Sequence, residues 1–295
     1  MELLYLVYAN GNEKIYMKER SKMSQYKLIG FDMDGTLLNS QKKISAQSIK
    51  AIKKAIQAGK IVIFNTGRCP AELEEYFEVL DEIQYLNCVS GALVFDRKNN
   101  IKIYTKTLDV EMIKQLLEIA SKEDDMVHLL SKDSIVQKDK IDKMVDYHMG
   151  VYQDMYQRVT DKWEDLVSQY YEKPFPVEKV NIYHTTSESR ERTRQRILES
   201  GLEVELTYAE TTSLEISAKG IDKGIGLEKI CEYLKISLNE TIVVGDADND
   251  IGAMKKAGLA IAMDNANENI KRLADVIVSD NDHDGCVEVI EKYLL

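Results

Sequence analysis

The stretch Lys27-Leu28-Ile29-Gly30-Phe31-Asp32-Met33-Asp34-Gly35 decides the fold of this chain. Its first five residues are too apolar for a half-exposed strand and too few for a helix, so they predict a buried central strand. Asp and Gly do not normally continue such a strand, so the chain is expected to turn at Asp32. Period-two alternation then places the side chains of Asp32 and Asp34 on the same side of the backbone. Two carboxylates held together there need a cation or a shared proton, and ligands bind at this end of an open parallel sheet.

Two simpler interpretations of this stretch are open at this point. One is a solvated acidic turn, which an isolated Asp-x-Asp-Gly usually is. The other is a calcium-binding EF-hand loop, but that loop needs Gly at its sixth position and Glu at its twelfth. Gly35 is only the fourth residue counted from Asp32. The rest of the chain therefore has to decide between these interpretations and a catalytic site.

A second strand end is predicted beside the first. Ser45 can cap a helix that ends at Gly59, and the apolar run 61–64 then predicts a second buried strand. This strand is followed by Asn65-Thr66-Gly67-Arg68, and Pro70 can open the next helix. Strand, helix and strand in this order form a right-handed parallel crossover, which places Thr66 beside Asp32 at one sheet edge.

The middle of the chain has a different pattern. After a short strand at 85–89 and Ser90-Gly91-Ala92, two apolar runs flank Asn99-Asn100, as in a β-hairpin. A helix capped by Asp109 follows, and later strands are expected near 180–183 and 213–216. This mixture of hairpins and helices predicts a separate α+β insertion.

The alternating α/β pattern returns near Lys219. Asp222 can cap a helix that begins at Lys223, and the strand 241–244 ends in Gly245-Asp246-Ala247-Asp248-Asn249-Asp250. Further strands are expected at 259–262 and 276–278, before a last amphipathic helix. This acidic loop also resembles a calcium loop, but Ile251 and Ala257 occupy the positions of the required Gly and Glu. We therefore reject the calcium interpretation.

These patterns divide the chain into three parts. Residues 23–91 and 215–295 are expected to form one discontinuous core, and residues 92–214 a cap inserted into it. Residues 1–22 are interpreted as an N-terminal extension, because Met23 is a natural start just before the first core strand. The alternative for this segment is an edge hairpin that turns at Asn10-Gly11-Asn12.

Composition narrows the class of protein. The chain has 295 residues and a formal charge of −11, which disfavours nucleic acid and anionic membranes as partners. No apolar run approaches the roughly 18 residues of a membrane span. The four cysteines are far apart and are expected to be reduced and buried, as in a cytoplasmic protein. The four histidines show no metal-ligand spacing and are interpreted as structural or surface residues.

The four polar stretches that contain Asp32, Thr66, Lys223 and Asp246, in this order, resemble the signature of the haloacid dehalogenase-like superfamily. The long insertion is similar to the cap of its Cof-type phosphatases. The resemblance covers about Met23 to the C-terminus. It implies a three-layer Rossmann-like core with a parallel sheet and a smaller α+β cap domain. One departure is Ser90, where related sequences often carry Asn, so no role of that Asn is transferred.

The resemblance also implies the chemistry. Asp32 would be the nucleophile that forms an aspartyl-phosphate, and Asp34 would act as general acid and then as general base. The implied ligands of Mg²⁺ are the Asp32 carboxylate, the Asp34 main-chain carbonyl and Asp246, with Asp250 in support. The phosphoryl oxygens would be held by Thr66, the Gly67 amide, Lys223 and Asn249.

The predicted function is a Mg²⁺-dependent phosphatase that acts on a small phosphorylated metabolite, with no nucleic acid or membrane partner. One alternative is a phosphomutase, whose cap needs a second phosphate clamp. The other is a non-catalytic binding module.

Arg68 is interpreted either as a brace of the site or as a substrate contact, and the tyrosines of the insertion are expected to pack. The sequence carries no signal for an oligomeric state. The one arginine series in the insertion is expected to be solvated: Arg190, Arg192, Arg194 and Arg196.

Overall fold

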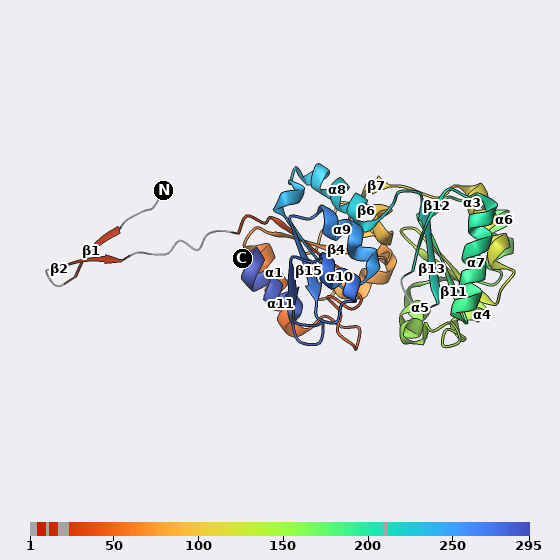
Figure 1. Ribbon diagram of the computed structural model, residues 1–295, viewed down its shortest axis with the longest axis horizontal. Coiled ribbons are helices and arrows are strands. Elements are labelled where there is room, and N and C mark those ends of the chain that lie inside the picture. Colours follow the sequence, from red (N-terminus) through yellow and green to blue (C-terminus); the bar gives the residue numbers. More distant parts are fainter. Residues whose placement is uncertain (1–4, 10–11, 17–23, 209–211) are drawn as a thin grey trace.

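The computed structural model describes residues 5–9, 12–16, 24–208 and 212–295. Most of these residues form two α/β units that lie side by side (Figure 1), one around an eight-stranded sheet and the other around a six-stranded sheet. We call these the core sheet and the cap sheet. The α/β architecture with a parallel core and an added α+β cap is therefore confirmed.

The core sheet has the order β16-β15-β14-β3-β4-β5-β6-β7, and it is parallel from β16 to β5. Strands β6 and β7 extend it in antiparallel pairing. Because β3 is central, the Asp32 turn lies near the middle of the sheet edge. The strands are β3 (Leu28–Phe31), β4 (Ile61–Asn65), β5 (Tyr85–Cys88), β6 (Leu93–Asp96), β7 (Ile101–Thr105), β14 (Thr241–Gly245), β15 (Leu259–Met263) and β16 (Val276–Val278).

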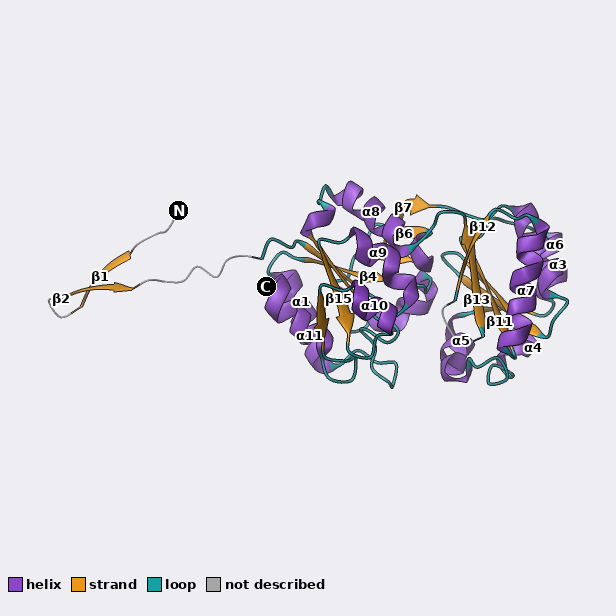
Figure 2. Ribbon diagram, viewed as in Figure 1, coloured by secondary structure: helices purple, strands orange, loops and turns teal. Residues whose placement is uncertain are grey.

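Helices cover both faces of the core sheet, which gives three layers (Figure 2). Successive side chains of β3 alternate between them: Ile29 packs with α1 and α11, and Leu28 packs with α8, α9 and α10. The helical segments of the core are α1 (Ala46–Gln57), η1 (Pro70–Leu73), α2 (Glu74–Phe77), η2 (Val89–Gly91), α8 (Lys223–Leu234), η4 (Leu238–Glu240), η5 (Asp248–Asp250), α9 (Ile251–Lys256), α10 (Glu268–Leu273), α11 (Gly285–Val289) and η6 (Ile290–Leu294).

The cap sheet has the order β10-β9-β8-β11-β13-β12. Its helices α3, α6 and α7 lie on the side away from the core (Figure 2), so the opposite sheet face is turned toward the core. The elements are α3 (Val110–Ala120), β8 (Asp125–Leu130), β9 (Ser134–Gln137), α4 (Lys138–Ile141), η3 (Gly150–Tyr152), α5 (Gln153–Val159), β10 (Asp161–Trp163), α6 (Leu166–Glu172), β11 (Lys179–His184), α7 (Ser187–Ser200), β12 (Val204–Thr207) and β13 (Ser213–Ala218).

The sheets do not divide the chain at the expected boundaries of 91/92 and 214/215. The hairpin β6–β7 belongs to the core sheet, because β6 returns directly against β5 with Cys88 opposite Leu93. Conversely, β13 belongs to the cap sheet, where it pairs with β11 and β12. A strand's alternation pattern is the same in either sheet, so the sequence does not show which sheet these two segments join.

Several local predictions are confirmed. Ser45, Asp109 and Asp222 each accept a hydrogen bond from a backbone N–H in the first turn of the helix that they cap. All four cysteines are free and buried. Among the described residues, no helix combines the length and apolar character needed to cross a membrane.

The N-terminal segment contains a pair of strands. Strands β1 (Tyr5–Ala9) and β2 (Asn12–Tyr16) are antiparallel and form a two-stranded sheet of their own. This agrees with the hairpin alternative, except that the pair is not an edge of the core sheet. The expected turn residues Asn10 and Gly11, and the expected start at Met23, lie outside the described residues.

Candidate active site

The Asp32 turn is hydrogen-bonded to the neighbouring strand β14. The backbone N–H of Asp32 donates to the Val244 carbonyl at 3.0 Å, which continues the pairing of β3 with β14. Gly35 then takes a φ of +80°, and a Cβ at this residue would lie 2.4 Å from Oδ2 of Asp246. Only glycine fits both the left-handed backbone and this close approach. The loop thereby lies directly against the Asp246 carboxylate.

Lys223 is buried behind Asp32. Its ammonium donates to Oδ1 of Asp32 at 2.6 Å and to Oδ1 of Asp250 at 2.8 Å. Asp222 fixes the first turn of α8 by accepting the Ile225 N–H at 2.9 Å. Asn87 of β5 holds the same turn through the Lys223 carbonyl at 2.8 Å. The start of α8 is therefore anchored on both sides, and this aims the lysine at the two carboxylates.

Three carboxylates meet at this point. Oxygen atoms of Asp32, Asp246 and Asp250 all lie within 4.8 Å of one another. Oδ1 of Asp246 accepts the Thr36 hydroxyl at 2.7 Å. Oδ2 of Asp250 accepts the N–H groups of Asp246 and Ala247 at 3.1 and 3.3 Å. Asp250 thus fixes the loop backbone and leaves Asp32 and Asp246 as the carboxylates with more free lone pairs.

The electrostatics of this cluster favour a bound cation. Burial raises the pKa of Asp32 well above its ordinary value, and Asp250 and Asp246 add to the rise although Lys223 opposes it. Burial and the charge of Asp250 raise the pKa of Asp246 to about 7. The three carboxylates offer only oxygen donors. Because one ammonium cannot neutralise all three, the cluster also carries excess negative charge. These are the properties of a site for a hard divalent cation such as Mg²⁺.

The Thr66-Gly67 loop follows β4 beside this cluster. The Thr66 N–H donates to the Asn87 carbonyl at 2.8 Å, and Oγ1 of Thr66 accepts the Arg68 N–H at 3.2 Å. Because this oxygen already accepts a hydrogen bond, its own proton is available to donate toward the cavity. Oδ1 of Asn249, on the opposite loop, is buried and has no partner among the described residues.

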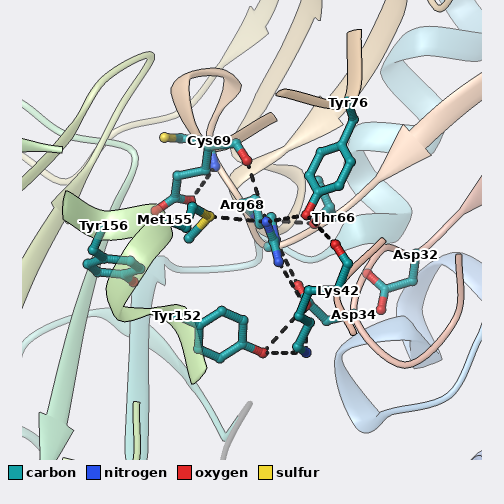
Figure 3. A network of polar contacts seen from close by, with 12 residues as sticks. Asp32, Asp34, Lys42, Thr66, Arg68, Cys69, Tyr76, Tyr152, Met155 and Tyr156 are labelled. Carbon is teal, nitrogen blue, oxygen red and sulfur yellow. Dashed lines mark hydrogen bonds and ion pairs between the residues drawn. The ribbon is translucent and has the colours of Figure 1, made fainter. Parts of the chain in front are cut away.

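Asp34 has cationic partners of its own (Figure 3). Arg68 binds it through two nitrogens, each at 2.8 Å, and Lys42 donates to Oδ1 at 2.9 Å. The Tyr152 hydroxyl, from the cap, lies 3.4 Å from the same oxygen. Burial disfavours the Asp34 carboxylate, but Arg68 and Lys42 outweigh it and hold the pKa of Asp34 well below its ordinary value. Arg68 therefore acts as the brace of Asp34, one of the two roles expected for it.

A cavity of about 330 Å³ lies between the core and the cap. It is lined by Asp32, Asp34, Thr66, Gly67, Asp246 and Asn249, so the structure brings six of the sequence-predicted site residues to one space. Lys223 and Asp250 do not line it but lie directly behind, in contact with each other and, through Lys223, with Asp32.

The cap contributes residues that the sequence reasoning did not assign to the site. Tyr152, Tyr156 and Tyr183 line the cavity, whereas the tyrosines of the insertion were expected only to pack. Asn181 also lines it. The available signal was the alternation in β11, where Asn181 and Tyr183 share one face. The sequence alone does not tell which face is turned toward the core.

The arginine series lies elsewhere. Arg192 and Arg196 of α7 both pair with Glu123, and Arg190 pairs with Glu191. None of the four arginines is among the residues that line the described cavity. A cluster of cap cations that could hold a second phosphate is therefore not part of this site as described.

Comparison with known proteins agrees with this geometry. A model of the haloacid dehalogenase-like hydrolase family matches residues 29–290. The 5-amino-6-(5-phospho-D-ribitylamino)uracil phosphatase YcsE of Bacillus subtilis is 28% identical over 269 residues, which cover 91% of this chain and 96% of the relative. The HMP-PP phosphatase of Yersinia pestis (strain Pestoides F) is 25% identical, with 84% of this chain and 87% of the relative covered.

Solved structures share the fold. A haloacid dehalogenase-like hydrolase from Bacteroides thetaiotaomicron has a TM-score of 0.79 at 24% identity, over 90% of this chain and 99% of that chain. The chain therefore belongs to the haloacid dehalogenase-like hydrolase family, as a phosphatase of its Cof type.

Proposed function

We propose that this protein is a Mg²⁺-dependent phosphatase that hydrolyses a small phosphorylated metabolite through a phosphorylated Asp32. The observation that carries the proposal is the shared cavity, in which Asp32 and Asp246 meet Thr66 and Asn249, with Lys223 bonded to Asp32 from behind. These residues come from distant segments of the chain, and their meeting at one cavity supports the roles proposed for them.

The residues present fit a divalent cation. Asp32, Asp246 and the Asp34 main-chain carbonyl are the proposed ligands, and Asp250 supports them by fixing the Asp246 loop. When bound, Mg²⁺ would reduce the repulsion between the Asp32 carboxylate and the anionic phosphoryl group.

The first proposed step is attack by an oxygen of Asp32 on phosphorus. A bond forms between Asp32 and phosphorus while the bond from phosphorus to the leaving oxygen breaks, and Asp34 supplies the proton that this oxygen takes up. The Thr66 hydroxyl, the Gly67 N–H and Asn249 would hold the phosphoryl oxygens as their charge shifts, and Lys223, buried behind Asp32, would add positive charge beside them. In the second step Asp34 takes a proton from a water, which attacks phosphorus and releases phosphate and the Asp32 carboxylate.

Asp34 is held as a carboxylate by Arg68 and Lys42, which is the form needed to accept a proton from water. To act as an acid in the first step, it must take up a proton. A phosphate ester that enters beside Asp34 brings negative charge, which favours the protonated acid and competes for both cations. We therefore propose that substrate binding loosens the Arg68–Asp34 pair.

Hydrolysis is better supported than the phosphomutase alternative. A mutase must hold a second phosphate, and the described cavity lining contains no arginine or lysine from the cap. The names of the relatives indicate phosphorylated small molecules as their substrates. The compound named for YcsE is therefore a rational first member of a substrate panel for this chain.

Asp32→Asn tests the proposal. We expect phosphate release from a panel of phosphate esters to fall by at least about a thousandfold, because an amide is a far weaker nucleophile than a carboxylate. A chelator should abolish wild-type activity, and added Mg²⁺ should restore it. Asp248→Asn is the matched control, since Asp248 is exposed in the acidic loop and does not line the cavity. Near-normal turnover by Asp32→Asn would refute the nucleophile assignment.

A further inference from the structure

The cap sheet turns a polar face toward the core, and this face roofs the cavity. Strand register places His128, Asn181 and Glu215 side by side on β8, β11 and β13. Tyr183 and Ser213 are opposite each other one row further along. All five line the cavity, and each is at least nine-tenths buried. Buried sheet faces are normally apolar, so this concentration of polar groups requires an explanation.

Hydrogen bonds within the roof satisfy most of these groups. Nδ2 of Asn181 donates to the Tyr183 hydroxyl at 3.0 Å, which also lies 3.0 Å from the Tyr156 hydroxyl. The His128 ring contacts the Tyr156 hydroxyl at 3.1 Å and the Ser134 hydroxyl at 2.7 Å. The network fixes the orientation of the Asn181 amide, because its nitrogen is committed to Tyr183.

One atom of the roof has no partner. Oδ1 of Asn181 is buried and makes no hydrogen bond in the described part of the chain, although Asn181 is only 5% exposed. An amide oxygen can only accept a hydrogen bond, so whatever completes it must donate an O–H or an N–H. A buried acceptor of this kind beside a catalytic cavity is the expected mark of a ligand contact.

The roof also lacks spare positive charge. Lys179 is bonded to Glu215 at 2.8 Å, so these two charges offset each other. Burial, assisted by Lys179, lowers the pKa of His128 to about 3, so its ring is neutral at physiological pH. Among the described residues that line the cavity, the cations are Lys42 and Arg68, and both come from the core and bind Asp34. A second anionic group on the substrate would find no counter-charge at the roof.

We propose that this roof, organised around Asn181 and Tyr183, is the leaving-group site, and that it takes an uncharged group with hydroxyl or amide N–H donors. The inference rests on the proposed phosphatase function, since it assumes that the phosphoryl group occupies the floor of the cavity beside Asp32. The substrate is then a monophosphate whose other end is a polyol or a neutral heterocycle. Esters with a second phosphate or a carboxylate at that end are poor substrates.

A matched pair of esters tests the charge rule. Sorbitol 6-phosphate and 6-phosphogluconate have the same chain length and differ at the far end, which is a hydroxymethyl group in one and a carboxylate in the other. We expect kcat/KM to be at least about 10-fold higher for sorbitol 6-phosphate, because the carboxylate must be desolvated without a partner. Equal values, or a preference for 6-phosphogluconate, would overturn the proposal.

Asn181→Leu tests the acceptor. We expect kcat/KM for sorbitol 6-phosphate to fall about 10- to 100-fold, while hydrolysis of p-nitrophenyl phosphate, whose leaving group has no donor, changes little. Gln195→Leu is the control, because it removes an exposed amide from the outer helix α7. If Asn181→Leu does not fold, Asn181→Asp serves in its place, because it keeps the acceptor. This variant should retain activity toward sorbitol 6-phosphate and discriminate more strongly against 6-phosphogluconate. Unchanged polyol hydrolysis by Asn181→Leu, or lost discrimination in Asn181→Asp, would contradict the assignment.

The two proposals fail in different ways. If the wild-type protein releases phosphate from p-nitrophenyl phosphate but shows no preference within the matched pair, only the leaving-group assignment is wrong. If it releases no phosphate from any ester in the presence of Mg²⁺, the phosphatase proposal is wrong and this inference falls with it.

Discussion

Lys223 is the single cation directly bonded to the carboxylate cluster in the described structure. A buried lysine is tolerated only when it is paired, and here two carboxylates lie within 2.8 Å of its ammonium. Burial opposes its charge, but Asp250 and Asp32 outweigh burial and raise the pKa of Lys223 above its ordinary value. The lysine is therefore a permanent charge, and it sets how much negative charge is left for a metal ion to neutralise.

Lys223→Met should destabilise the fold because it leaves the buried carboxylates without their counter-charge. We expect the free energy of unfolding to fall by about 3–5 kcal/mol, as for other broken buried pairs. We also expect Mg²⁺ to raise the melting temperature of this variant more than that of the wild type, since its cluster is more negative. Thermal denaturation with chelator and with Mg²⁺ measures both effects.

The control for this experiment is Lys229→Met, on the exposed side of the same helix, where the lysine pairs with Glu232 in solvent. Exposed pairs of this kind contribute little to stability. If the two variants lose the same stability and respond alike to Mg²⁺, Lys223 does not have the electrostatic role assigned to it.

At the scale of single residues, the sequence predicted those positions that follow a strand or open a helix. Asp32, Thr66 and Asp246 follow strands of a parallel sheet, and Lys223 follows Asp222, the N-cap residue of helix α8. Their convergence therefore followed from topology. The partner of Arg68 could not be predicted in this way. Its guanidinium reaches back across the loop to Asp34, and this contact depends on side-chain rotamers that no sequence pattern encodes.

At the scale of elements, β11 and β13 connect the cap to the Thr66-Gly67 loop and to Ser90. Lys179 of β11 donates to the Gly67 carbonyl at 3.0 Å and to the Ser90 hydroxyl at 3.3 Å. Ser90 also donates to Glu215 of β13 at 3.1 Å. Ser90 adopts a left-handed backbone with φ of 56°, which is more favourable for Asn than for Ser. In this conformation Ser90 contacts Lys179 and Glu215 of the cap sheet. These contacts could not be derived from the Ser90-Gly91-Ala92 sequence.

Strand β8 contains a buried acid, Asp125, from which we expect a pH dependence of the stability of the cap. Asp125 is 7% exposed, and Oδ2 has no partner in the described residues. Burial, with Asp124 and Glu123 nearby and only Lys140 opposing, raises the pKa of Asp125 to about 8. Between its ordinary pKa near 4 and this value, the folded state holds a proton that the unfolded state has released. Stability from this group is therefore lost as the pH rises toward 8.

Asp125→Asn should remove this dependence, because asparagine cannot ionise. We expect the variant to gain stability relative to the wild type at about pH 8.5 and to gain less at about pH 5.5, where Asp125 keeps its proton in the folded state. The difference in melting temperature between the variant and the wild type, measured at both pH values, should increase by roughly 2–4 °C or more. Asp133→Asn, at an exposed turn residue, is the control. A difference that is the same at both pH values would show that Asp125 does not carry the proton.

At the scale of the whole molecule, the candidate active-site cavity has a floor and a roof that are built separately. The floor comes mainly from loops at strand ends of the core sheet, and the roof from one face of the cap sheet together with η3 and α5. Figure 1 shows the core and the cap side by side. The sequence predicted that Asp32, Thr66 and Asp246 lie together in the floor, because each follows the end of a recognisable strand. It did not predict the roof, because the alternation that contains Asn181 and Tyr183 is typical of any strand. Only the placement of the cap shows which face of this strand is turned toward the cavity.

The same reason explains why sheet membership does not follow the expected domain boundaries. Whether β6–β7 and β13 extend one sheet or the other depends on pairing partners that are far apart in the chain, or on a tight return such as that between Cys88 and Leu93. Local pattern is compatible with both. The α/β class and the order of the motifs follow from local sequence, whereas the assignment of strands to sheets does not.

The central claim is that phosphoryl transfer passes through Asp32, and acid quenching during turnover followed by peptide mass spectrometry tests it most directly. The peptide containing Asp32 should carry one phosphoryl group, which hydroxylamine should remove because it is an acyl phosphate, and Asp32→Asn should show none. A phosphoryl group on another residue, or rapid turnover with no phosphorylated peptide under conditions that trap acyl phosphates, would contradict the account.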